Sequence, residues 1–181
     1  MPILGVIASS TRQGQATDTG AMFPLGVVSV GSGGAANIEF TSIPATYTHL
    51  QVRVLHANST AGNGFDVQLN NDSTSGRYTI HAMLADGSGI STATNGSTSF
   101  GRLYSSNTTF GPAIIDIVNY ANTNKTKTVR ALCGWDSQSA GVLSLSHFLY
   151  TQTTAVSSIK CFPSGGANWS QYTHFALYGI K

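Results

Sequence analysis

The acidic side chains are the first candidates for chemistry, because paired carboxylates perform the acid–base steps of glycoside hydrolysis. No two of them stand at a spacing that makes a local pair, although residues from distant strands can converge in a fold. With so few carboxylates, we expect no enzymatic activity, and hydrolysis of a cell-surface glycan is the weaker alternative. The seven acidic residues are Asp18, Glu39, Asp66, Asp72, Asp86, Asp116 and Asp136.

The histidines and cysteines do not form a metal-binding pattern. The chain has no His-Glu-x-x-His motif and no Cys/His cluster at zinc spacing, so we expect no metal and no cofactor. His147 shares strand parity with Leu143, Leu145 and Leu149, which indicates a histidine in the core or at a subunit interface. The alternative is an axial metal site in a trimer, which needs one ligand from each chain.

Motifs for nucleophilic catalysis and phosphate binding are also missing from the sequence. A serine nucleophile in an elbow requires Gly-x-Ser-x-Gly, which does not occur. The glycine clusters at 31–34 and 164–166 lack the lysine of a phosphate loop, so they are predicted to be turns.

Two tryptophans lie in loop-like contexts, GWDSQS and ANWSQY. Sugars stack on aromatic faces and form hydrogen bonds with amide and carboxylate groups, so these segments are the candidate glycan contacts. The alternative is that each tryptophan covers one end of the fold or fills a subunit interface. The candidate glycan-contact group is Trp135, Asp136, Asn168, Trp169 and Gln171.

The composition favours a protein that works within an assembly. Only 9% of the 181 residues are charged, against about 25% in typical soluble domains, so little electrostatic repulsion keeps molecules apart. The formal net charge of +2 argues against a nucleic-acid partner. No run approaches the roughly 18 apolar residues of a membrane span, and none is predicted.

Alternation of apolar and polar residues dominates the chain, and no segment carries an apolar stripe with helical period. Gly, Asn, Ser and Pro clusters separate the alternating segments, as in antiparallel hairpins. We therefore predict an all-β fold, an antiparallel β-sandwich that is jelly-roll-like, with about ten strands. The predicted strands lie within residues 24–30, 37–43, 49–57, 64–71, 77–84, 111–120, 127–135, 142–150, 156–163 and 172–180.

One segment, residues 111–120, is apolar on both faces. Ile115 and Ile117 alternate with Ile114 and Val118, which predicts a central strand covered on both sides. One of the covers could be a second subunit. The predicted subunit interface consists of Ile114, Asp116, Val118 and His147.

Two segments do not fit the sandwich. Residues 86–99 lack apolar periodicity and are predicted to be a long loop. Residues 1–22 are predicted to be an N-terminal attachment arm, followed by the sandwich domain at 23–181; the alternative for the arm is a first edge strand. The arm's apolar residues, Ile3, Leu4, Val6 and Ile7, would be a liability at a free chain end unless they dock.

Four segments, MPILGVIASS, FTSIPATYTHLQVRV, IIDIVNYANTNKTKTVRALCG and YTHFALYGIK, cover most of the chain with the intervening sequence. Together they resemble small virion-associated structural proteins of tailed bacteriophages, of the capsid decoration, cement, fibre or minor tail type. The resemblance implies a compact β domain that is trimeric and either decorates a capsid or forms part of a fibre. It also implies that the N-terminal segment is the attachment element. No catalytic motif comes with it.

The sequence hypothesis is therefore a non-enzymatic phage structural protein made in the bacterial cytoplasm and located in the virion. Its expected partners are further copies of itself, as a homotrimer, and a major capsid protein or tail protein. The alternative is a receptor- or carbohydrate-binding module that mediates host adsorption through a surface glycan.

Overall fold

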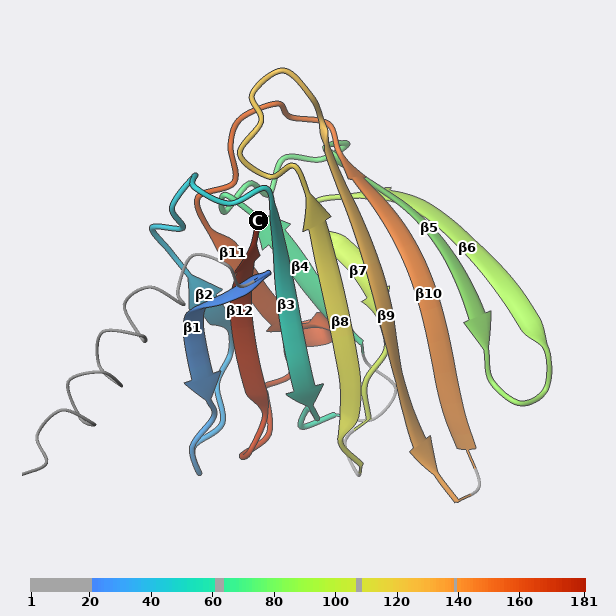
Figure 1. The fold of residues 1–181 in the computed structure, drawn as a ribbon. Coiled ribbons are helices and arrows are strands. Elements are labelled where there is room, and N and C mark those ends of the chain that lie inside the picture. The colour runs from blue at the N-terminus through green and yellow to red at the C-terminus, as the bar shows by residue number, and fades with distance from the viewer. Residues whose placement is uncertain (1–20, 61–63, 107–108, 139) are drawn as a thin grey trace, which may run out of the picture.

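The computed structural model describes residues 21–60, 64–106, 109–138 and 140–181. The predicted attachment residues Ile3, Leu4, Val6 and Ile7 lie outside the described residues. The described part forms two antiparallel sheets packed face to face, which confirms the predicted all-β sandwich (Figure 1). Its strands are β1 (Met22–Ser29), β2 (Ile38–Phe40), β3 (His49–His56), β4 (Phe65–Leu69), β5 (Tyr78–Ala85), β6 (Ile90–Ser97), β7 (Phe100–Leu103), β8 (Gly111–Val118), β9 (Lys127–Ser137), β10 (Ala140–Tyr150), β11 (Ile159–Pro163) and β12 (His174–Ile180), with one 3-10 turn, η1 (Ser164–Gly166).

The strand order is that of a jelly roll. The large sheet has the order β1-β12-β3-β8-β9-β10-β5-β6, and the small sheet has the order β2-β11-β4-β7. Without the hairpins β5–β6 and β9–β10, the sheets reduce to β1-β12-β3-β8 and β2-β11-β4-β7, the two interleaved four-stranded sheets of a jelly roll. The two hairpins add four strands to one edge of the large sheet, and Figure 1 shows them fanning out beyond the small sheet.

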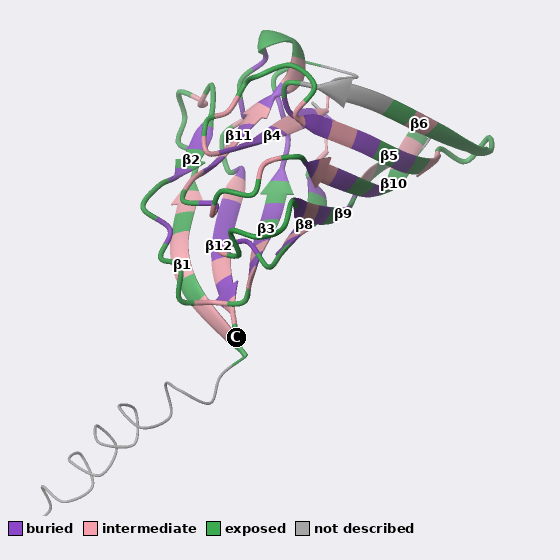
Figure 2. Ribbon diagram, turned by 90° about the horizontal axis from the view of Figure 1, so that it is seen from above, coloured by how far each residue is buried: buried purple, intermediate pink, exposed green. Residues whose placement is uncertain are grey.

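The core lies between the sheets and is built by strand alternation. On β8, Ala113, Ile115 and Ile117 are buried, while Ile114 and Val118 between them are exposed. Figure 2 shows buried segments alternating with more exposed ones along the strands. The prediction that this strand is covered twice is therefore wrong within one chain, because no other described element of the chain covers its second face.

All ten predicted strands are present, but the prediction of a long loop at 86–99 is wrong. Residues Ile90–Ser97 form β6, which pairs with β5 through eight residues in register. Most described side chains of β6 are exposed, because β6 is an edge strand beyond the small sheet. A strand with neither face buried has no reason to alternate apolar and polar residues, so its sequence looks like a loop.

Candidate functional site

Four apolar side chains form a row across the outer face of the large sheet, the face turned away from the small sheet. Leu132 of β9 pairs with Ile114 of β8 and with Leu145 of β10, and Leu145 pairs in turn with Met83 of β5. Directly opposite residues on neighbouring strands hold their Cβ atoms about 5 Å apart, so the four side chains are contiguous. The exposed fractions of this apolar row are 39% for Ile114, 48% for Leu132, 44% for Leu145 and 48% for Met83.

A polar row runs beside the apolar row on the same face. Asp116 pairs with Gln51 and Arg130, Arg130 pairs with His147, and His147 pairs with His81. The Gln51 amide donates to Asp116 Oδ1 at 2.8 Å, and Arg130 Nη2 lies 3.7 Å from Asp116 Oδ2. The polar row thus borders the apolar row with charges of both signs.

The structure brings the four predicted interface residues to this one face. Ile114 belongs to the apolar row, Asp116 and His147 belong to the polar row, and Val118 lies exposed at the end of β8. His147 is exposed, so the option of a core histidine is wrong, and its interface role stays a prediction.

The apolar row continues into a hollow at one end of the same face, which we call the apolar hollow. Its volume is about 820 Å³. Gly134, which lies opposite Leu143, lines the hollow without a side chain, and a Cβ there would lie only 2.6 Å from the Val142 carbonyl oxygen. Aromatic, aliphatic and acidic side chains line the hollow, among them Phe110, Ile114, Leu132, Trp135, Leu143, Asp86 and Asp136.

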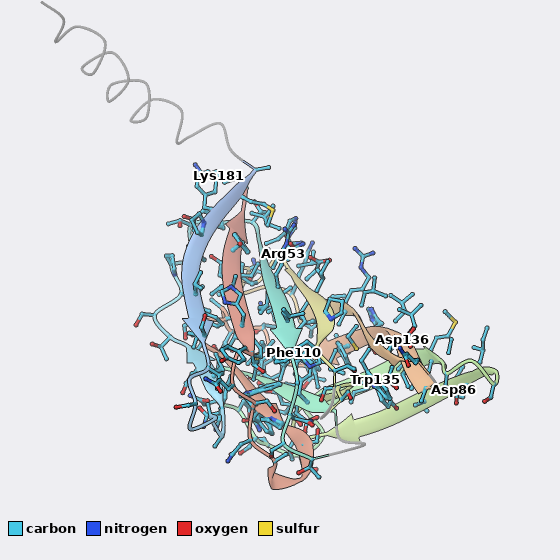
Figure 3. All side chains as sticks on the ribbon, turned by 90° about the horizontal axis from the view of Figure 1, so that it is seen from below. Arg53, Asp86, Phe110, Trp135, Asp136 and Lys181 are labelled. Atoms are coloured by element: carbon cyan, nitrogen blue, oxygen red, sulfur yellow. The ribbon has the colours of Figure 1, made fainter. Side chains whose placement is uncertain are left out.

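The candidate glycan-contact group does not form one site. Trp135 and Asp136 line the apolar hollow, and Figure 3 shows them with Phe110 and Asp86 at the same end of the sheet. Asn168 instead lines a hollow on the small sheet, and Gln171 is exposed and lines neither hollow.

Trp169 is fully buried, so its prediction as a glycan contact is wrong. Its ring centroid lies 5.3 Å from that of Phe65 and 5.0 Å from that of Phe175, and its indole Nε1 donates to the Cys161 carbonyl at 3.4 Å. Trp169 is instead part of the hydrophobic core.

A second hollow of about 670 Å³ lies on the outer face of the small sheet, and we call it the polar hollow. Sequence reasoning missed this site. Alternation within GFDVQLNN puts Asp66 and Gln68 on the face opposite Phe65 and Val67, but the sequence does not reveal that β2, β4 and β11 are neighbours. The side chains that these three strands contribute to the hollow include Glu39, Asp66, Gln68, Lys160 and Phe162.

Each hollow is lined by two carboxylates that are distant in sequence. Glu39 and Asp66 line the polar hollow, and Asp86 and Asp136 line the apolar hollow. Partial burial raises the pKa of Asp66 to about 6, and a hydrogen bond with Ser164 acts in the opposite direction. Among the described residues, no group of three or more His, Cys, Asp or Glu side chains could hold a metal ion.

No helix within the described residues has the length and apolar character to cross a membrane.

Comparisons with known proteins show little similarity. No family model and no curated protein matches the chain. A crystal structure of a protein of unknown function from Shewanella oneidensis MR-1 is 12% identical over 90% of this chain and 77% of that one, with a TM-score of 0.23. An alginate lyase mutant in complex with an alginate tetrasaccharide is 13% identical over 88% of this chain and 73% of that one, with a TM-score of 0.21.

Proposed function

We propose that the protein is a non-enzymatic structural component of a phage virion that self-assembles through the outer face of its large sheet. The assembly is a homotrimer, and residues 1–22 attach it to a capsid or tail protein as a decoration, cement or fibre component. The location and the trimer come from the sequence resemblance. The assembly surface comes from the apolar row.

The apolar row is the observation that carries the proposal. Burying a whole Leu, Ile or Met side chain contributes about 1.5–3 kcal/mol, so covering four half-exposed ones provides a substantial driving force for association. Contiguous exposed apolar surface with a polar border is typical of protein–protein contact sites. The neighbouring apolar hollow offers further depth for a partner side chain.

A second copy of the chain fits this surface by charge as well as by hydrophobicity. The polar row contains Asp116 and Arg130. At the end of the apolar row, Arg53 of β3 lies directly opposite Ile114. A surface that carries both signs at its border can place its own acid against the base of an identical copy. A partner with a single sign of charge gains less from this arrangement.

The virion location is tested by peptide mass spectrometry and cryo-electron microscopy of the purified phage particle. The expected result is stoichiometric peptides of this chain and density at capsid threefold or quasi-threefold positions, or at the tail or fibres. Absence of the peptides from purified, infectious particles would contradict the proposal.

Host adsorption through a surface glycan is the second candidate function, favoured by the apolar hollow. Trp135 and Phe110 line this hollow with Asp86 and Asp136, which combines aromatic surface with hydrogen-bond acceptors. Replacing Trp135 with alanine should then weaken attachment to host cells while the protein stays folded. Unchanged attachment of the folded variant would exclude this hollow as the adsorption site.

A further inference from the structure

The polar hollow has an ordered arrangement of side chains that assembly on the other face of the sandwich does not use. Lys160 of β11 pairs with Glu39 of β2 on one side and with Gln68 of β4 on the other. One step along the strands, Phe162 of β11 pairs with Asp66 of β4. The outer face of the small sheet therefore presents two carboxylates, an ammonium, an amide and an aromatic ring in two adjacent rows.

Contacts within the fold hold these side chains in place. The Asn71 amide donates to Glu39 Oε1, and the Gln68 amide donates to the Thr98 carbonyl at 3.2 Å. Lys160 Nζ lies 5.7 Å from the centroid of the Phe162 ring. Side chains that are already fixed lose less conformational freedom when a ligand binds, so the face is preorganised for binding.

The Asp66 carboxyl fits against β7 because the residue facing it there, Gly101, has no side chain. A Cβ on Gly101 of β7 would lie 2.6 Å from Asp66 Oδ1, so this carboxyl occupies room that a larger residue would fill. Half-burial raises its pKa to about 6, which means that the fold bears a cost to keep a charged group there at neutral pH. Groups held at such a cost are enriched at binding sites.

The walls give the hollow the dimensions of a ligand site. Residues of η1 line the hollow together with Asn71 and Ser73, and Asn37 and Asn168 add two more amides. A volume of about 670 Å³ lies within the range of small-molecule sites, roughly 300–1,000 Å³.

We propose that the polar hollow binds a neutral oligosaccharide. Sugar hydroxyls donate to carboxylates and exchange hydrogen bonds with amides, and the C–H face of a sugar ring packs on an aromatic side chain such as Phe162. Two carboxylates against one ammonium disfavour a polyanionic chain by charge repulsion. The site lies on the sandwich face opposite the apolar row, so it does not depend on the proposed self-assembly.

The test is a titration of the 15N-labelled protein, followed by amide chemical shifts, with four neutral tetrasaccharides and one acidic one. The neutral probes are maltotetraose, cellotetraose, mannotetraose and N-acetylated chitotetraose, and the acidic probe is tetragalacturonate. At about 10 mM ligand, where even millimolar dissociation constants give strong occupancy, at least one neutral probe should shift the amides of Asp66, Gln68 and Lys160. Tetragalacturonate should not shift them.

Two substitutions locate the site. Glu39→Gln keeps the size of a side chain that is exposed, and Lys160→Met keeps the apolar stem, so both variants should fold. Each should weaken binding of the neutral probe by about tenfold, the loss expected for one hydrogen bond to a charged group. Lys125→Met, at an exposed residue that lines neither hollow, and Arg130→Gln in the polar row are the matched controls and should bind normally.

Three outcomes would overturn the proposal: no neutral probe shifts these amides, the shifts map to the Trp135 hollow, or binding survives both substitutions. Failure of self-association in the same samples would leave this test unaffected, so the two proposals fail separately.

Discussion

Leu132 on β9 and Leu145 on β10 lie directly opposite each other on the outer face of the large sheet, and both are about half exposed. Two residues further along the same strands, Arg130 and His147 also lie directly opposite each other on this face, and both are polar. One pair of strands thus carries an apolar step and a polar step side by side. Because the apolar and polar pairs are adjacent, a partner that buries the leucines must leave Arg130 and His147 hydrated or paired, which restricts how it can align on the sheet.

Neighbouring isoleucines on β8 should respond very differently to truncation. Ile115 faces the core and Ile114 faces out, so Ile115→Ala should cost about 2–5 kcal/mol of unfolding free energy and Ile114→Ala less than about 1 kcal/mol. Both are best introduced together with Leu132→Asp, which we expect to prevent self-assembly, and measured by urea denaturation, so that assembly does not contribute. Equal losses would mean that the outer face is covered within one chain.

His56 should make the fold sensitive to mild acid. It is fully buried between aromatic rings, its ring nitrogens have no hydrogen-bond partner among the described residues, and burial lowers its pKa to about 4. The unfolded state therefore binds more protons between pH 6.5 and 4, and the free energy of unfolding should fall by about 2–3 kcal/mol as the pH drops through this window.

Replacing this histidine isolates the effect. His56→Leu keeps the site filled and should remove that part of the pH dependence while raising stability at pH 5, as measured by chemical denaturation at several pH values. Other groups titrate in the same window in both proteins, so the difference between the two curves reports His56 alone. Parallel curves would show that His56 does not titrate on unfolding.

Asp66 should contribute a slope of the opposite sign. Its pKa is raised to about 6 in the folded protein, so the folded state binds more protons than the unfolded state between about pH 4 and pH 6. The stability that this group contributes is present below that window and is lost as the pH rises through it. Asp66→Asn should therefore raise the free energy of unfolding at pH 7 by about 1 kcal/mol, allowing for partial solvent screening.

The same variant tests why the carboxyl is there. If Asp66 serves ligand binding, Asp66→Asn should be more stable at pH 7 yet bind the neutral tetrasaccharide more weakly. The paired measurement is thermal unfolding and the amide-shift titration on one sample. A variant that is more stable and binds equally well would remove Asp66 from the ligand site.

Strand positions could be predicted because alternation records burial. HLQVRVLH and GPAIIDIV each put their buried residues at every second position, and both are strands with that parity. β6 and β7 were missed: β6 because its edge position leaves it little to bury, and β7 because its four residues are too few to show a period. The strand order could not be predicted, because it depends on the pairing of strands that are far apart in sequence, such as β1 with β12 and β2 with β11. Only the jelly-roll type of fold was expected.

The position of a site residue could be predicted from the sequence only where the alternation within its own strand decides which way it faces. Strand parity places Ile114 and Val118 outward, but the row also needs Leu132 and Met83, which reach it through the pairings of β9 and β5. Trp169 was misassigned because its neighbours Asn168 and Ser170 are polar. The aromatic rings that enclose it come from other elements, which no local pattern reveals.

The central claim is that the outer face of the large sheet is a self-assembly surface, and sedimentation velocity at micromolar concentration tests it most directly. The comparison is between the natural chain, Leu132→Asp, Leu145→Asp and the control Val27→Asp, which alters an exposed apolar residue on β1 at the far edge of the same sheet. We predict a trimer for the natural chain and for Val27→Asp, and folded monomers for the two leucine variants, because a buried unpaired carboxylate costs more than the contact it replaces. A natural chain that sediments only as a monomer, or leucine variants that still assemble, would contradict the account.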